Sequence, residues 1–110
     1  MDATHLYGLT KGLAEHVCRW FSVNHGLSIL ALRLYAPASR EVWLEQCRKR
    51  MPNGFTTHAD LARAYNAALR LTNHTGFDVL FISGDQTGTY VNYEKAGRML
   101  GWQPRDRFPA

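Results

Sequence analysis

Cysteine is scarce in this sequence and histidine is not clustered, which argues against metal and disulfide chemistry. The two cysteines, Cys18 and Cys47, have neither the short spacing of a metal site nor that of a redox pair. The five histidines stand singly along the chain, and His16, two positions from Cys18, does not form a ligand pair with it. We therefore predict no metal site, and two buried thiols in a reducing cytoplasm.

Long hydrophobic runs are also lacking. The most apolar segment, Leu27–Tyr35, is too short to cross a bilayer as a helix, and it carries Arg33. The N-terminus lacks the basic start and apolar stretch of a signal peptide. The composition, 45% hydrophobic and 20% charged, is typical of a globular chain. We predict one cytoplasmic domain over residues 1–110, with no membrane association.

Acidic residues are outnumbered by basic ones, and the net charge is +4. The basic residues cluster at Arg48–Arg50 and around Asp106, which is flanked by Arg105 and Arg107. Such clusters can bind nucleic acid or a phosphorylated ligand, but they also occur at solvated helix ends, where basic side chains favour the C-terminal dipole. Because no nucleic-acid-binding motif accompanies the charge, we favour the second interpretation.

Hydrophobic periodicity predicts a mixed α/β fold. The continuous apolar run Leu27–Leu34 is typical of a strand buried on both faces of a parallel sheet, and a second strand is expected at Asp78–Ile82. Turn and cap residues then delimit four helices and one short extended piece. The helices are expected from Thr4, as the cap, to a stop at Gly26, then over Ser39–Arg50, Ala59–Leu71 and Asn92–Leu100, with the extended piece at Phe55–Thr57.

The first predicted helix carries a pair of residues that suits acid/base chemistry. Tyr7 and Lys11 are four positions apart, so their side chains should project from one helix face. A lysine ammonium about 4 Å from a phenol stabilises the phenolate by roughly 4 kcal/mol at an effective dielectric of about 20. That interaction would lower a tyrosine pKa from about 10 toward 7, where the phenol can act as a general acid or base.

Four stretches of the chain resemble, in the right order, the extended short-chain dehydrogenases, the NAD-dependent sugar epimerase/dehydratase family. Residues 6–16 (LYGLTKGLAEH) are similar to its "YGxSKxxxE" helix, and residues 24–34 (NHGLSILALRL) to its "YGL" turn and "xxLR" strand. Residues 55–64 (FTTHADLARA) are similar to "FxHVDDxARA", and residues 100–106 (LGWQPRD) to the terminal "LGWxPxx".

The resemblance implies roles for particular residues. Tyr7 would be the catalytic acid/base, and Lys11 would lower its pKa and hold the nicotinamide ribose of NAD or NADP. The segment Tyr35, Ala36 and Pro37 would lie beside the nicotinamide, although it replaces a longer "GNVYGP"-type segment of the family.

The family's glycine-rich dinucleotide-binding half has no counterpart here, since no G-x-x-G-x-x-G motif occurs. We therefore expect a partial Rossmann-like fold of about two parallel strands and about four helices, with no cofactor bound by this chain alone. The expected function is that of a truncated, non-catalytic domain that self-associates or binds a partner, such as a separate N-terminal half. The alternative is the C-terminal part of an active NAD(P)-dependent oxidoreductase or epimerase.

Two further expectations concern substrate and assembly. Asp60 follows Arg33 by only 27 positions, which resembles the compact branch that includes uronate dehydrogenases and argues against a nucleotide-sugar substrate. Without the preceding strand of the family, the Leu27–Leu34 strand would have an open edge, and the first helix would have little sheet to cover. We therefore predict a homodimer built through the first helix, the strand edge or an exchange of elements.

Overall fold

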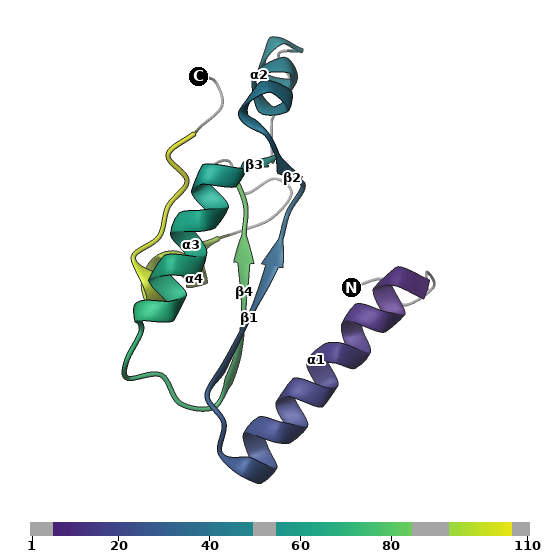
Figure 1. The fold of residues 1–110 in the computed structure, drawn as a ribbon, viewed down its shortest axis with the longest axis vertical. Helices are drawn as coiled ribbons and strands as arrows, with labels where there is room; N and C mark the ends of the chain where they lie inside the picture. The colour runs from purple at the N-terminus through teal and green to yellow at the C-terminus, as the bar shows by residue number, and fades with distance from the viewer. Residues whose placement is uncertain (1–5, 50–54, 85–92, 107–110) are drawn as a thin grey trace. The chain divides into compact units, whose positions relative to one another are not determined.

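The computed structural model describes residues 6–49, 55–84 and 93–106 (Figure 1). This part of the chain contains four helices and four strands, which confirms a mixed α/β fold. The elements are α1 (Leu6–His25), β1 (Ile29–Leu34), β2 (Pro37–Ala38), α2 (Arg40–Arg48), β3 (Thr56–Thr57), α3 (His58–Arg70), β4 (Phe77–Ile82) and α4 (Glu94–Leu100). None of the described helices is long and apolar enough to span a membrane.

The two longer strands pair with each other, and the two short strands form a second pair. The Ile29 amide donates to the Gly76 carbonyl at 2.9 Å, and the Tyr35 amide donates to the Ile82 carbonyl at 3.0 Å. From the first bond to the second, the donor moves from Ile29 to Tyr35 and the acceptor from Gly76 to Ile82, both toward the C-terminus. The strands β1 and β4 are therefore parallel, as predicted from the sequence. The pairing of β2 with β3 is also parallel.

The chain divides into two compact units, and the boundary between them falls within β1 and β4. The first unit comprises Met1–Ala31 and Asn73–Val79, and the second comprises Leu32–Thr72 and Leu80–Ala110. Each unit is described by itself below.

In the first unit, α1 ends where the sequence predicts. Gly26 has a φ of 68°, and its amide donates to the Ser22 carbonyl at 3.0 Å. Glycine adopts this left-handed conformation at little cost, so it closes the helix. The strand that follows begins at Ile29 rather than at the expected Leu27. The predicted cap, Thr4, lies outside the described residues.

In the second unit, capping side chains begin two helices. The Ser39 hydroxyl accepts from the Val42 amide at 3.3 Å, which confirms the predicted start of α2. The Thr57 hydroxyl caps α3 in the same way, accepting from the Asp60 amide at 3.3 Å, so α3 begins at His58, one residue before the expected Ala59.

The predicted ends of α2 and α4 need partial correction. α2 ends at Arg48, with Lys49 as its C-cap, and not at Arg50. Tyr93 occupies the N-cap position of α4 without a side-chain cap bond, and the expected cap, Asn92, lies outside the described residues. The left-handed Gly101 ends α4 as predicted, with a φ of 66°.

The core of the second unit is formed by α3 with the elements that contact it, namely β2, β3 and α4. Its buried apolar side chains belong to helices, strands and the segment after α4. They are Ala38, Trp43, Leu61, Ala64, Leu80, Ile82, Ala96 and Trp102. Trp102 folds back as predicted, because its indole N–H donates to the Asp60 carbonyl at 3.0 Å.

The short β2–β3 ladder requires a close approach of two backbones. The Gly84 amide donates to the Thr56 hydroxyl at 3.2 Å, and the Thr56 hydroxyl donates to the Tyr35 carbonyl at 2.7 Å. A Cβ atom on Gly84 would collide with the carbonyl oxygen of Phe55. Glycine at this position therefore allows the end of β4 to lie against β3.

We expect Gly84→Ala to lower the free energy of unfolding by about 1–3 kcal/mol, because the backbone of Phe55 must move to admit the methyl group. The matched control is Gly12→Ala in α1, where nothing lies within 4 Å of the added Cβ. This control should raise the free energy of unfolding by about 0.5–1 kcal/mol. Urea denaturation of both variants measures the difference, and equal effects would contradict the packing at Gly84.

Candidate functional site

Tyr7 and Lys11 lie on one face of α1, as predicted. The Lys11 ammonium nitrogen is 5.5 Å from the centroid of the Tyr7 ring, a cation–π arrangement. Tyr7 is 74% exposed and Lys11 is also exposed, so a ligand can reach both. The Thr10 hydroxyl donates to the Tyr7 carbonyl at 2.8 Å within the same turn. The geometry thus provides a phenol and a cation side by side on an open helix surface.

Tyr35, Ala36 and Pro37 belong to the second unit, at the carboxyl end of β1. Ligands of open α/β sheets bind at such strand ends. Here the Tyr35 amide and carbonyl already bond Ile82 and Thr56, and the Ala36 carbonyl accepts from the Thr56 amide at 3.1 Å. The backbone groups of Tyr35 and the Ala36 carbonyl are therefore already engaged within the protein.

Ala36 has an unusual backbone conformation within this segment. Its φ is 43°, in the region where a side chain costs roughly 1 kcal/mol or more. The bond from Thr56 to the Ala36 carbonyl holds the residue in place. This turn could not be predicted from the sequence, because neither Ala36 nor its neighbour Pro37 is a residue that favours positive φ.

Asp60 has a larger role than the helix-dipole interaction expected from its place in the first turn of α3. Its side chain is buried, with a residue exposure of 1%. One carboxylate oxygen accepts from the Arg63 guanidinium at 2.6 Å, and both oxygens accept from the Arg105 amide at 3.0 and 3.1 Å. The Asp106 amide adds a bond of 3.0 Å. Asp60 therefore anchors the segment after α4 onto α3.

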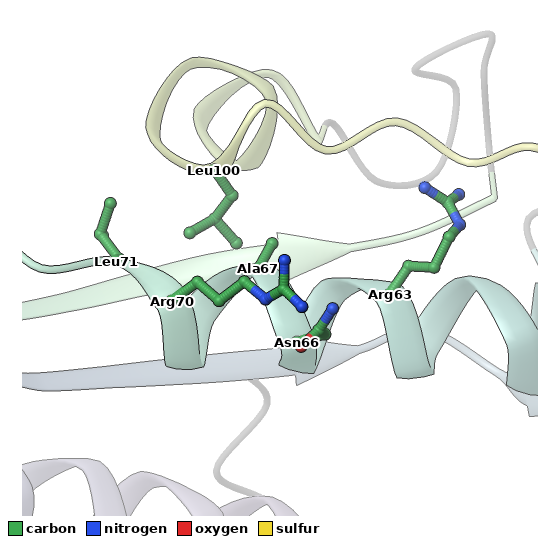
Figure 2. A pocket seen from close by; sticks show the side chains of 6 residues that line it. All are labelled: Arg63, Asn66, Ala67, Arg70, Leu71 and Leu100. Carbon is green, nitrogen blue, oxygen red and sulfur yellow. The ribbon is translucent and has the colours of Figure 1, made fainter.

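A hollow of about 430 Å³ lies beside this anchor, between the C-terminal half of α3 and the end of α4 (Figure 2). Two arginines and an asparagine line it together with apolar side chains. The lining residues are Arg63, Asn66, Ala67, Arg70, Leu71 and Leu100. Figure 2 shows Arg70 running along α3 toward Asn66, while Arg63 extends toward the segment after α4.

The charge of Arg63 is already engaged, because it also donates to the Gln103 carbonyl at 2.8 Å. A second, open hollow shares Arg63 and continues along Gly101, Gln103, Pro104 and Arg105. These surfaces are basic and shallow, and Arg63 serves mainly to hold the protein together. We therefore regard them as secondary to the Tyr7–Lys11 pair.

The described residues contain no group of three or more histidine, cysteine, aspartate or glutamate side chains that could hold a metal ion. Cys18 and Cys47 are free thiols, and both are half-buried rather than fully buried as expected.

Comparison of the chain with models of protein families finds no match. Curated proteins and solved structures give no match either. Membership of the epimerase/dehydratase family therefore stays a prediction from the four sequence stretches.

The polar network around Asp60 continues to Asp106. Burial acts to raise the pKa of the Asp106 carboxyl, but hydrogen bonds from Thr57 and Arg40 outweigh it, with the charges of Arg40 and Arg63 adding to their effect. The net result is a pKa below the ordinary aspartate value. The Thr57 hydroxyl donates to this carboxylate at 2.7 Å, and Arg40 forms an ion pair with it.

Because the folded-state pKa is lowered, Asp106 stabilises the fold above its unfolded pKa of about 3.9, and this contribution is lost as the pH falls through the folded value. We expect Asp106→Asn to have a lower free energy of unfolding than the wild type at neutral pH, and this difference to shrink as the pH falls below the unfolded pKa and through the lowered folded one. Urea denaturation across this pH range measures the effect. Glu45→Gln, which removes an exposed carboxylate of α2, is the control. A difference in free energy of unfolding between Asp106→Asn and the wild type that stays constant across the pH range would refute the lowered pKa of Asp106.

Proposed function

We propose that this chain is a Rossmann-like association domain of the epimerase/dehydratase type, which pairs with a second copy through α1. The observation that carries the proposal is the exposure of the apolar row of α1. Its members are between 42% and 77% exposed. They are Leu6, Leu9, Leu13, Val17, Trp20 and Phe21.

The burial pattern of α1 differs from that of an amphipathic helix packed on its own core. Such a helix directs its apolar stripe to its own core and its polar side to solvent. The buried residues of α1 are instead the small Gly8 and Ser22, whereas Leu13, Val17 and Trp20 are each more than half exposed. An exposed apolar row of this length favours association.

The C-terminal end of the row carries a preformed aromatic cluster. The Trp20 and Phe21 rings pack edge to face, with their centroids 5.0 Å apart. The centroid of the His25 ring is 5.3 Å from that of Trp20 and 5.5 Å from that of Phe21. Aromatic side chains lose little conformational entropy on binding, and tryptophan is enriched among residues that dominate interface energies. This end of α1 can therefore anchor a partner.

The energetics allow a second copy to be the partner. Burying an exposed apolar side chain contributes about 1.5–3 kcal/mol, while association costs about 4–15 kcal/mol. Two rows of six residues offer twelve side chains to one isologous interface, enough to exceed that cost. In an antiparallel pair, the aliphatic N-terminal end of one α1 would face the aromatic end of the other.

We expect the wild-type chain to be a dimer at micromolar concentration, with twice the monomer mass of 12.5 kDa. Val17→Glu and Trp20→Glu should shift it to monomer, because each places a charge in the apolar row. Leu69→Glu is the control, since Leu69 is 84% exposed but lies on α3. Light scattering measures the mass; a monodisperse wild-type monomer, or dissociation by Leu69→Glu alone, would refute the proposal.

The second candidate function is catalytic, and the proximity of Lys11 to the Tyr7 ring favours it. In this case the chain would be part of an NAD(P)-dependent oxidoreductase or epimerase acting on a sugar or uronate. Tyr7 would exchange a proton with a substrate hydroxyl, and Lys11 would hold the nicotinamide ribose. The bound cofactor would supply the hydride chemistry.

We expect no turnover of NAD or NADP with uronates by this chain alone, because the Tyr7–Lys11 pair provides no grip on the dinucleotide phosphates. Absorbance of the reduced nicotinamide measures turnover, and calorimetry measures cofactor binding. Activity that disappears in Tyr7→Phe but persists in Tyr65→Phe, a change of an exposed tyrosine on α3, would support the catalytic function instead.

A further inference from the structure

Three side chains in the first unit form a hydrogen-bonded chain that lies apart from Tyr7 and Lys11. The Ser28 hydroxyl oxygen is 2.5 Å from Nδ1 of His74, and Nε2 of His74 is 2.9 Å from a carboxylate oxygen of Asp78. The parallel register of β1 and β4 produces this arrangement, since the Ile29–Gly76 hydrogen bond places Ser28 opposite the turn that contains His74.

The carboxylate sets the direction of the hydrogen bonds. An ionised aspartate only accepts, so Nε2 of His74 carries a proton and donates it to Asp78. In the neutral imidazole Nδ1 is then an acceptor, and the Ser28 hydroxyl is the donor that reaches it. The His74 carbonyl, 2.9 Å away, is a second acceptor for the same hydroxyl.

The exposure of the three groups differs in a way that suits a nucleophile. Ser28 is exposed, whereas only 7% of the His74 side chain and 33% of the Asp78 side chain are accessible. A nucleophile joined to a base, with the base oriented by a third group, is the arrangement that activates serine on unrelated folds. Here the serine is an exposed residue, while the side chain of the base beside it is shielded.

We propose that Ser28 is a nucleophile for acyl transfer from activated carboxylic esters, with His74 as its general base. The Ser28 oxygen bonds to the ester carbonyl carbon while its proton passes to Nδ1 of His74. The carbon–oxygen bond to the leaving group then breaks, and the proton on His74 neutralises the departing alkoxide or phenolate. Water, deprotonated by His74, next attacks the acyl-serine and releases the carboxylic acid and the free hydroxyl.

Asp78 is a positioning residue in this scheme, because it acts through His74. It keeps the proton of the neutral imidazole on Nε2, which leaves Nδ1 free to accept from Ser28. An asparagine there would donate from its amide and favour the opposite tautomer. The acceptor at Nδ1 would then be lost without a change in side-chain size.

The test is acetylation of the wild-type chain by p-nitrophenyl acetate, followed by peptide mapping of the acetyl group. We expect preferential labelling of Ser28. Ser39, also a partly accessible serine but bonded to a backbone amide rather than to a histidine, is the internal reference. Labelling of Ser28 no faster than Ser39 in folded protein would overturn the proposal, whatever the variants do.

Variants then separate the roles. Ser28→Ala should remove the label, and His74→Gln should slow labelling of Ser28 at least about 100-fold, the usual range for a general base. Asp78→Asn should also slow it, with recovery in Asp78→Glu, while Ser39→Ala should leave it unchanged. Circular dichroism confirms folding of each variant. Unchanged labelling in a folded His74→Gln or Asp78→Asn protein would show that the three side chains only hold the turn in place.

Discussion

The second unit depends on the burial of one carboxylate. Asp60 accepts from Arg63 and from two successive backbone amides, those of Arg105 and Asp106. A buried charge left without its partners destabilises a protein by about 3–5 kcal/mol, so the segment after α4 is held where its amides meet Asp60. Asp106 is thereby placed against Thr57 and Arg40, which extends the network to the start of α2. One aspartate thus ties two helices and the segment after α4 together.

The first unit differs in that the large apolar side chains of its helix α1 are exposed. α1 buries Gly8 and Ser22 and leaves its large apolar side chains exposed, so its surface lacks the apolar cover that a monomer normally provides. Stability gained by covering that row would belong to the assembly and would depend on protein concentration. If the row is covered as proposed, α1 contributes to the stability of the chain mainly through its partner, whereas the Asp60 network acts within one copy.

The elements that could be predicted from the sequence are those determined by neighbouring residues. The cap at Ser39 and the left-handed stops at Gly26 and Gly101 are local features, and each was found where expected. The shared face of Tyr7 and Lys11 follows from helical periodicity alone. The β2–β3 ladder could not be predicted, because two residues are too short for a periodic pattern and the positive φ of Ala36 has no sequence signal.

The remaining contacts were missed because they join residues far apart in the sequence: strand register brings Ser28 to His74, whereas the segment after α4 folds back and brings Asp106 to Asp60. Ser28 and His74 are 46 positions apart, and Asp60 and Asp106 are separated by the same distance. In a strand, successive side chains point to opposite faces, so a slip of one residue between β1 and β4 would move Ser28 away from His74. The register marked by the Ile29–Gly76 hydrogen bond is therefore the one that joins Ser28, His74 and Asp78.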